Sequence, residues 1–211
     1  MPDRRERRPR RRLTKEARRA EILDAALRAF VRGGYHGTQV EDVIREAGVA
    51  RGTFYLHFAS KHDVFAALVD QTLGVFLDAR PPIPERAAFR TAADVERRLG
   101  EVYTRLFETF HRHRALGRLL FEEAVGVDKG FAERLERHFR IWHERVRAAM
   151  RILQERGLVR RDLDVDVSAD LVLGMVERLA RRHLFQERSP DVARLVSAMV
   201  AMETRGVLGK R

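Results

Sequence analysis

A segment of thirteen residues from Val49 to Lys61, VARGTFYLHFASK, combines side chains that bind through hydrogen bonds, aromatic faces and positive charge. It is too polar for a helix of the core and too aromatic for an ordinary solvent-facing helix. Its composition therefore raises the question of which partner this segment contacts.

Other parts of the chain offer only weak candidates for metal binding. Asp162, Asp164 and Asp166 imitate the start of a calcium loop, but the loop should have Gly where Val167 stands and Glu where Leu173 stands. We therefore reject a calcium site.

Two histidines, His111 and His113, could begin a metal site, but no third ligand is evident, and a solvated basic patch explains them better. The sequence contains no glycine-rich phosphate loop, no nucleophile elbow and no His-Glu-x-x-His motif. It gives no positive signal for catalysis, and we expect no metal, no cofactor and no enzymatic activity.

Charge points to an anionic partner. The net charge is +11, which favours nucleic acid or a membrane surface. Met1–Leu13 holds seven arginines against Asp3 and Glu6, so this stretch alone carries +5. We expect a disordered arm over residues 1–13. It is either a solubilising or cloning-derived tail, or an arm that contacts phosphates or a minor groove of DNA.

Composition limits the class of protein. The 211 residues are 45% hydrophobic and 35% charged, as in a soluble globular protein of one or two domains. The absence of cysteine excludes disulfides and thiolate metal sites. No apolar run approaches the roughly 20 residues of a membrane span, and no apolar stretch follows the basic N-terminus as in a secretory signal. We therefore expect no membrane partner.

The elements that position the first segment are helices. Apolar residues recur at spacings of three and four almost throughout the chain, and no convincing strand or internal repeat is present. Thr14 and a Thr38-x-x-Glu41 capping box begin two of the helices, while Gly33-Gly34 and Gly48 end them. The pattern predicts an all-α fold of about nine helices, over residues 14–32, 39–47, 50–58, 61–78, 92–112, 116–125, 129–155, 167–185 and 190–207.

Two of these helices are very short and adjacent. Residues 39–47 and 50–58 are joined by a tight turn at Gly48-Val49, which matches the helix-turn-helix used on DNA. The proline-rich segment 80–84 cannot be helical and reads as a linker. We therefore expect a helix-turn-helix domain over residues 14–79 and a second helical domain over residues 80–211.

This part of the chain resembles the TetR family of bacterial transcriptional regulators. The resemblance covers about residues 18–75 and is most specific in the segment GVARGTFYLHFASK. Ile44 departs from the family pattern, which usually has Ala at this close contact between helices. Residues 92–211 resemble the family only in their helical layout.

The resemblance implies a recognition helix in the major groove of double-stranded DNA. Arg51 would reach a base edge, Gly52 would let the backbone approach, and Thr53 would touch a base or a thymine methyl group. The other implied contacts are with phosphates. They come from Thr38, Tyr55, His57 and Lys61.

The resemblance also implies that the second domain senses a small-molecule effector and forms a homodimer. A dimer would place two recognition helices on a palindromic operator. The protein would then be a cytoplasmic, nucleoid-associated bacterial repressor released by a ligand, although its operator, its effector and the choice between repression and activation stay open. Candidate pocket residues are Phe107, Phe110, Phe121, Phe139 and Trp142, and candidate interface residues are Leu171, Met175, Leu195 and Met199.

Two other classes stay open on the sequence alone. One is a small, basic helical enzyme, which turnover without DNA binding would reveal. The other is an architectural DNA-binding protein without sequence preference, which would bind random duplex as tightly as any selected site.

Overall fold

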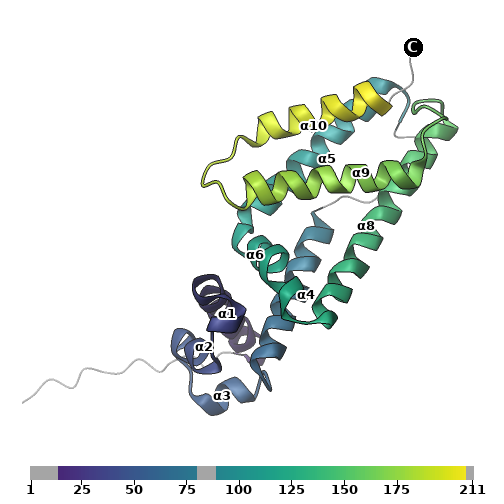
Figure 1. Cartoon of the computed structure of the whole chain (residues 1–211). Helices are drawn as coiled ribbons and strands as arrows, with labels where there is room; N and C mark the ends of the chain where they lie inside the picture. Colours follow the sequence, from purple (N-terminus) through teal and green to yellow (C-terminus); the bar gives the residue numbers. More distant parts are fainter. Residues whose placement is uncertain (1–13, 80–88, 208–211) are drawn as a thin grey trace, which may run out of the picture. The chain divides into compact units, whose positions relative to one another are not determined.

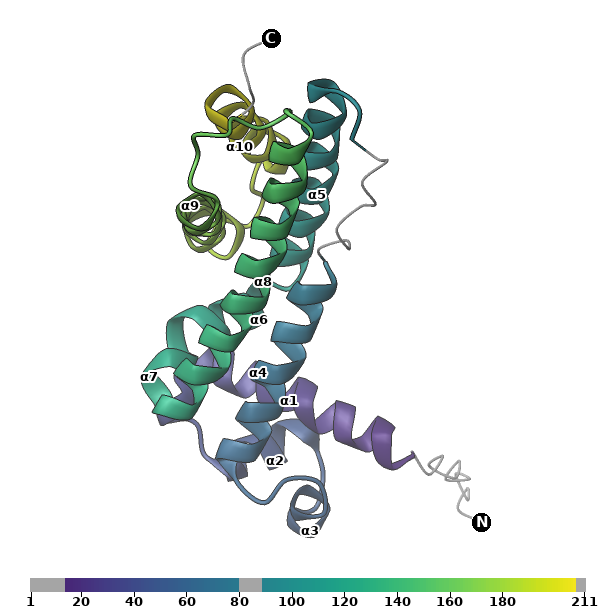
Figure 2. The ribbon, with the colours of Figure 1, turned by 90° about the vertical axis from the view of Figure 1, so that its right-hand side faces the viewer.

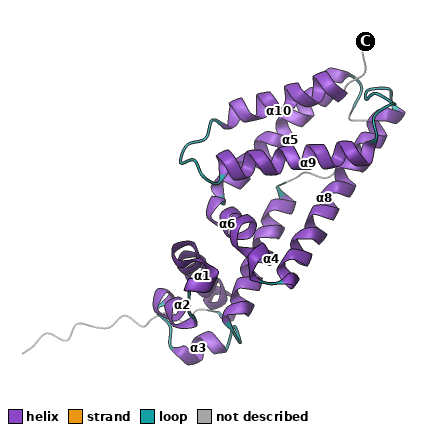
Figure 3. Ribbon diagram, viewed as in Figure 1, coloured by secondary structure: helices purple, strands orange, loops and turns teal. Residues whose placement is uncertain are grey.

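The computed structural model describes residues 14–79 and 89–207. Every regular element in these two ranges is helical, so the predicted all-α fold is confirmed for them (Figure 3). None of the described helices has the length and apolar character needed to cross a bilayer. The predicted arm, residues 1–13, and the predicted linker at residues 80–84 lie outside the described residues.

The chain divides into two compact units, residues 1–65 and 66–211, and the fourth helix runs through the division. The predicted boundary at residue 80 therefore stays a prediction. The first unit contains α1 (Lys15–Gly37), α2 (Val40–Ala47), α3 (Arg51–Tyr55) and the beginning of α4 (Lys61–Asp78), as Figure 1 shows.

Local sequence signals set the ends of these helices. The Thr14 hydroxyl accepts a hydrogen bond from the Ala17 amide at 3.1 Å and caps α1. Gly34 has a φ of 67°, which interrupts α1 where the glycine pair predicted its end. Gly48, with a φ of 62°, ends α2, and the Ser60 hydroxyl caps α4 by accepting from the Asp63 amide.

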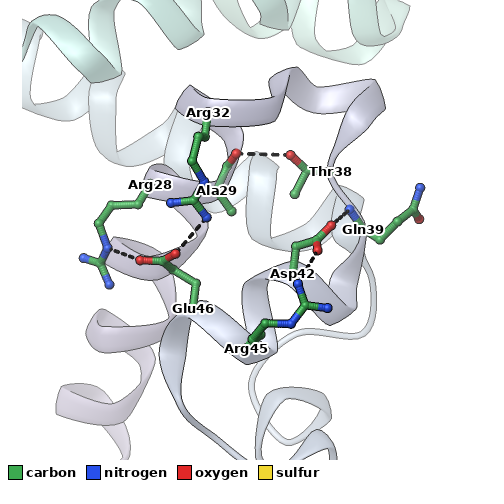
Figure 4. A network of polar contacts seen from close by, with 8 residues as sticks. All are labelled: Arg28, Ala29, Arg32, Thr38, Gln39, Asp42, Arg45 and Glu46. Carbon is green, nitrogen blue, oxygen red and sulfur yellow. Dashed lines mark hydrogen bonds and ion pairs between the residues drawn. The ribbon is translucent and has the colours of Figure 1, made fainter.

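The predicted capping box of α2 is wrong by one residue. Gln39 is the N-cap, and its amide donates to the carboxylate of Asp42 at 2.9 Å, so Glu41 is not the capping acid. The Thr38 hydroxyl lies instead 2.7 Å from the carbonyl oxygen of Gly34 and 3.2 Å from that of Ala29. Thr38 therefore closes the turn after α1 from inside (Figure 4).

Aromatic packing holds the first unit together. The ring of Phe65 on α4 contacts Phe30 at 5.1 Å and Tyr35 at 4.7 Å between centroids. Val43 of α2 and Phe54 of α3 are fully buried. Helices as short as α2 and α3 are not stable alone, so these buried side chains fix the position of both helices.

The second unit is also helical. Its helix α5 packs against α10, and α8 packs against α9 (Figure 2). The predicted bounds of the helices at 92–112 and 129–155 are confirmed. The elements that follow the end of α4 are α5 (Ala92–Arg112), α6 (Arg114–Arg118), η2 (Leu119–Ala124), α7 (Val125–Val127), α8 (Lys129–Glu155), α9 (Val165–Leu179), η3 (Ala180–Leu184) and α10 (Val192–Val207).

Two π-helical segments were not predicted. The expected helix over 116–125 is divided among α6, η2 and α7, and the helix expected over 167–185 changes to η3 at Ala180. The rings of Phe121 and Phe185 bring these segments together, with centroids 5.6 Å apart. A Cβ on Gly117 would lie 2.3 Å from the Phe185 ring, so only glycine permits this contact.

The residues weighed as metal ligands have structural roles. Asp164 caps α9, Asp162 pairs with Arg160 at 2.5 Å, and Asp166 pairs with Arg147 at 3.2 Å. His111 Nδ1 lies 3.2 Å from the carbonyl oxygen of Leu184.

Burial makes His138 of α8 a source of acid sensitivity. Its side chain is 8% exposed, and burial, followed by the nearby Arg145, lowers its pKa from 6.5 to about 4. The unfolded chain binds the proton of this histidine more readily than the folded chain does. The contribution of neutral His138 to the free energy of unfolding is therefore complete above pH 6.5, and it is lost as the pH falls toward 4. Between pH 7 and 5 we expect this histidine to cost about 2 kcal/mol of the free energy of unfolding.

The test is denaturant unfolding of the wild type and of His138→Leu at both pH values. The variant should lose less stability on acidification. Equal losses in the two proteins would contradict the assignment.

Candidate nucleic-acid interface

Helix α3 buries one face and exposes the other. Phe54 is buried, and Phe58 just after the helix is buried as well, with ring centroids 5.9 Å apart. Arg51, Tyr55 and Leu56 are exposed. The short helix is thus anchored through Phe54 and the following Phe58, and it presents Arg51, Gly52 and Tyr55 to solvent.

Arg51 is the first residue of α3, and its side chain is held from two sides. The guanidinium Nη1 lies 3.0 Å from Oε1 of Glu41 on α2. The guanidinium carbon lies 5.6 Å from the centroid of the Tyr55 ring, a cation–π contact. The structure therefore brings together Arg51 and Tyr55, two of the predicted DNA contacts, and places Glu41 beside Arg51.

Gly52 and Thr53 follow on the same helix. Gly52 is exposed, has helical backbone angles, and a Cβ built on it would meet no atom within 4 Å. Packing inside the chain therefore does not require glycine here. Thr53 is half-buried.

His57 lies in the turn after α3 and is half-buried. Its Nδ1 is buried and has no hydrogen-bond partner among the described residues. A phosphate contact by this imidazole would therefore have to come from Nε2.

Lys61 and Thr38 were expected to bind phosphates, but both side chains make hydrogen bonds within the chain. The Lys61 ammonium donates to the carbonyl oxygens of Tyr35 at 2.8 Å and Thr38 at 2.9 Å, and it lies 4.4 Å from the Tyr35 ring centroid. It connects the start of α4 to the turn between α1 and α2. The Thr38 side chain is only 2% exposed, so it supports this turn and does not offer its hydroxyl to solvent.

An ionic cluster that the sequence analysis missed joins α2 to α1. Glu46 accepts from Arg28 at 2.7 Å and from Arg32 at 2.8 Å, and these hydrogen bonds lower the pKa of its carboxyl (Figure 4). On α2 itself, Arg45 donates to Asp42 at 3.1 Å. The spacing of Arg28 and Arg32, four apart on one helix face, was the available signal.

Four of the five predicted pocket residues form one ring cluster in the second unit. Phe110 stacks on Trp142 with centroids 5.9 Å apart, and Phe139 contacts both Trp142 and Phe121. Phe107 packs on Tyr103 instead. Phe76 and Phe185, which sequence reasoning missed, complete the cluster.

The predicted interface residues separate into two kinds. Leu171 is 63% exposed and Met175 is half-buried, so both are available to a partner. Leu195 and Met199 are buried within the chain itself, because α10 turns this face toward α5. Val167 on α9 and Met202 on α10 are further exposed apolar side chains that the sequence analysis did not select.

Comparison with known proteins identifies the family. The sequence profile described as "Bacterial regulatory proteins, tetR family" matches residues 22–68. The HTH-type transcriptional repressor AcnR of Corynebacterium diphtheriae is 31% identical over 168 residues, which cover 77% of this chain and 81% of that protein. The chain belongs to the TetR family. It is a helix-turn-helix transcriptional regulator, as the sequence predicted.

Other relatives of this TetR-family protein agree. The HTH-type transcriptional repressor KstR2 of Mycobacterium tuberculosis is 30% identical over 156 residues, covering 72% of this chain and 74% of that protein. The crystal structure of the regulator FadR from Bacillus subtilis, in complex with stearoyl-CoA, has the same fold with a TM-score of 0.70. It is 20% identical and is covered over 98% of its chain, against 89% of this one. All three relatives are transcriptional regulators.

Proposed function

We propose that this TetR-family protein is a homodimeric repressor that binds a palindromic operator through α3 and is released by a small molecule. The observation that carries the proposal is the exposed face of α3. It presents Arg51 and Tyr55 around Gly52, whose missing side chain leaves the backbone open to approach. An exposed arginine next to an open backbone suits a base edge in the major groove.

The contacts are divided between bases and phosphates. Arg51 and Thr53 read bases, and Tyr55 and His57 bind phosphates. Lys61 has three N–H donors, and two are directed at backbone carbonyls. Its third donor and its charge can serve a phosphate while the other two hold the turn. Thr38 acts indirectly, by shaping that turn.

A dimer would form through the exposed apolar residues of the last two long helices. Val167 and Leu171 lie four residues apart on α9 and so share one face of that helix. Exposed apolar side chains at such spacing fit a helix–helix contact with a second copy.

Selection of bound sequences from a random duplex pool tests this proposal. We expect a palindrome whose half-site centres are about one helical turn, roughly 10 base pairs, apart. A pool that shows no enrichment after several rounds would favour the architectural, non-specific binder instead.

The effector is expected to be largely apolar and to bind at the ring cluster around Trp142 and Phe110. The stearoyl-CoA in the related FadR structure supports this class of ligand. A ligand that releases DNA must bind the low-affinity conformation of the protein better than the DNA-bound one.

Trp142 is the only tryptophan of the chain, so its fluorescence reports directly on this cluster. We expect titration with stearoyl-CoA to change the emission of the wild type. Trp142→Phe should require about twofold to tenfold more of this ligand to release the operator, since it loses part of the ring contact. If Trp142→Phe releases the operator at the same ligand concentration as the wild type, Trp142 does not contact the effector.

A further inference from the structure

Glu41 is an acid in a place where a DNA-binding surface gains nothing from negative charge. It is the second residue of α2, is 53% exposed, and pairs across helices with the side chain of Arg51. The other two acids of α2 have partners that explain them within the fold. Asp42 caps its own helix, and Glu46 binds the two arginines of α1.

The charge of this unit makes the arrangement more informative. Residues 14–65 contain eight Lys and Arg and seven Asp and Glu, a net charge of +1. Apart from the +5 stretch at residues 1–13, the first unit therefore draws little on general attraction to phosphate, and the placement of each cation matters more. Committing Arg51 to a carboxylate further reduces its use as a phosphate ligand.

The contacts of Arg51 within the chain leave the edge formed by its Nε and Nη2 atoms open to DNA. Glu41 engages Nη1, and the Tyr55 ring lies against the guanidinium. A guanidinium has five N–H donors in one plane, so the Nε and Nη2 edge stays available for two parallel hydrogen bonds to guanine O6 and N7. The Glu41 carboxylate holds one edge of the Arg51 guanidinium, and the Tyr55 ring limits the rotation of the guanidinium plane.

We infer that Glu41 is a specificity-determining residue that positions Arg51 for guanine and withholds it from phosphates. This inference rests on the proposed role of Arg51 in base reading. On a site with guanine, Arg51 keeps its ion pair with Glu41 and also donates hydrogen bonds to the guanine. On random DNA, Arg51 stays on Glu41 and does not add a phosphate contact.

The experiment is a cycle of variants: wild type, Glu41→Gln, Arg51→Ala and the double variant. Each is titrated on the selected operator and on scrambled duplex, and each is used in a fresh selection. Glu41→Gln should bind scrambled duplex about threefold more tightly and lose about threefold to tenfold in the operator-to-scrambled ratio. Its base preference should relax only at the base pair that Arg51 reads, and the Arg51→Ala background should abolish both effects.

Two further variants separate positioning from net charge. Glu41→Asp keeps the charge but shortens the side chain and so releases Arg51, and it should relax the same base preference and gain on scrambled duplex as Glu41→Gln does, whereas a gain caused only by the lost charge would be absent. Glu21→Gln removes a different exposed acid, which pairs with Arg18 on α1, and should leave the base preference unchanged.

Two results would overturn the inference while leaving the proposed function intact. One is an equal gain of Glu41→Gln on operator and scrambled duplex. The other is a loss of preference that persists in the Arg51→Ala background. If Arg51→Ala itself keeps every base preference, the assignment of Arg51 in the proposed function fails, and the role of Glu41 fails with it.

Discussion

Leu171→Glu is expected to convert the protein to a monomer and to weaken operator binding by at least about 100-fold, because two linked half-site contacts become independent. The side chain is already 63% exposed in the single chain, so the substitution should not disturb the fold of one copy. In a dimer, the same carboxylate would be buried without a partner. Sedimentation at micromolar concentration and titration of the operator measure the two effects.

A matched control comes from α8. Ile141 is also an exposed apolar residue, and Ile141→Glu makes the same change of charge on α8, which the proposed interface does not use. It should remain dimeric and bind the operator normally. A dimeric Leu171→Glu protein would show that the interface lies elsewhere. A monomeric wild type would show that the protein does not act as the proposed dimer. Leu195→Glu is unsuitable here, because that residue is buried in its own chain.

Lys61→Met is expected to lower the stability of the helix-turn-helix unit and to weaken binding to operator and random duplex alike. The variant keeps the apolar stem but loses the hydrogen bonds to the carbonyl oxygens of Tyr35 and Thr38. Hydrogen bonds from a charged donor are worth about 1.5–3 kcal/mol each when buried. Since this ammonium is only partly buried, we expect about 1–3 kcal/mol in total.

Thermal unfolding, followed together with a salt series of DNA titrations, tests this dual role. Lys15→Met makes the same change of charge at an exposed residue of α1 and should keep wild-type stability. Wild-type stability of Lys61→Met, with a salt dependence reduced by about two units per dimer, would make Lys61 a phosphate ligand only.

The sequence predicted best the features that depend on neighbours along the chain. Helices α5 and α8 have the predicted bounds, because Thr91 and Asp128 cap them through side chains three residues from the amide they bind. Gly48 ends α2 because its left-handed backbone conformation suits glycine.

Features that depend on distant residues could not be read in this way. The π segments η2 and η3 lie where Phe185 contacts Phe121 and approaches Gly117, residues more than sixty positions away in the sequence. The use of Lys61 on α4 to hold the turn after α1 has the same cause, since periodicity shows which residues share a helix face but not which partner each meets.

The candidate site shows both sides of this limit. Resemblance to the family selected Arg51 and Tyr55, and the structure brings them into contact. Glu41 was assigned to a capping box, because a Thr-x-x-Glu spacing is a strong local signal. Only the packing of α2 beside α3 directs its carboxylate to Arg51.

If α3 reads DNA sequence through Arg51, then Arg51→Ala and the wild type should differ in base preference and not only in affinity for DNA. Both proteins are titrated on the selected operator and on scrambled duplex, and both are used in selection from the same random pool. Arg51→Ala should lose about 1–3 kcal/mol per half-site on the operator and little on scrambled duplex, with preference relaxed at one base pair of each half-site. Equal losses on both duplexes, with every base preference intact, would make Arg51 a phosphate ligand and leave α3 without its base-reading arginine.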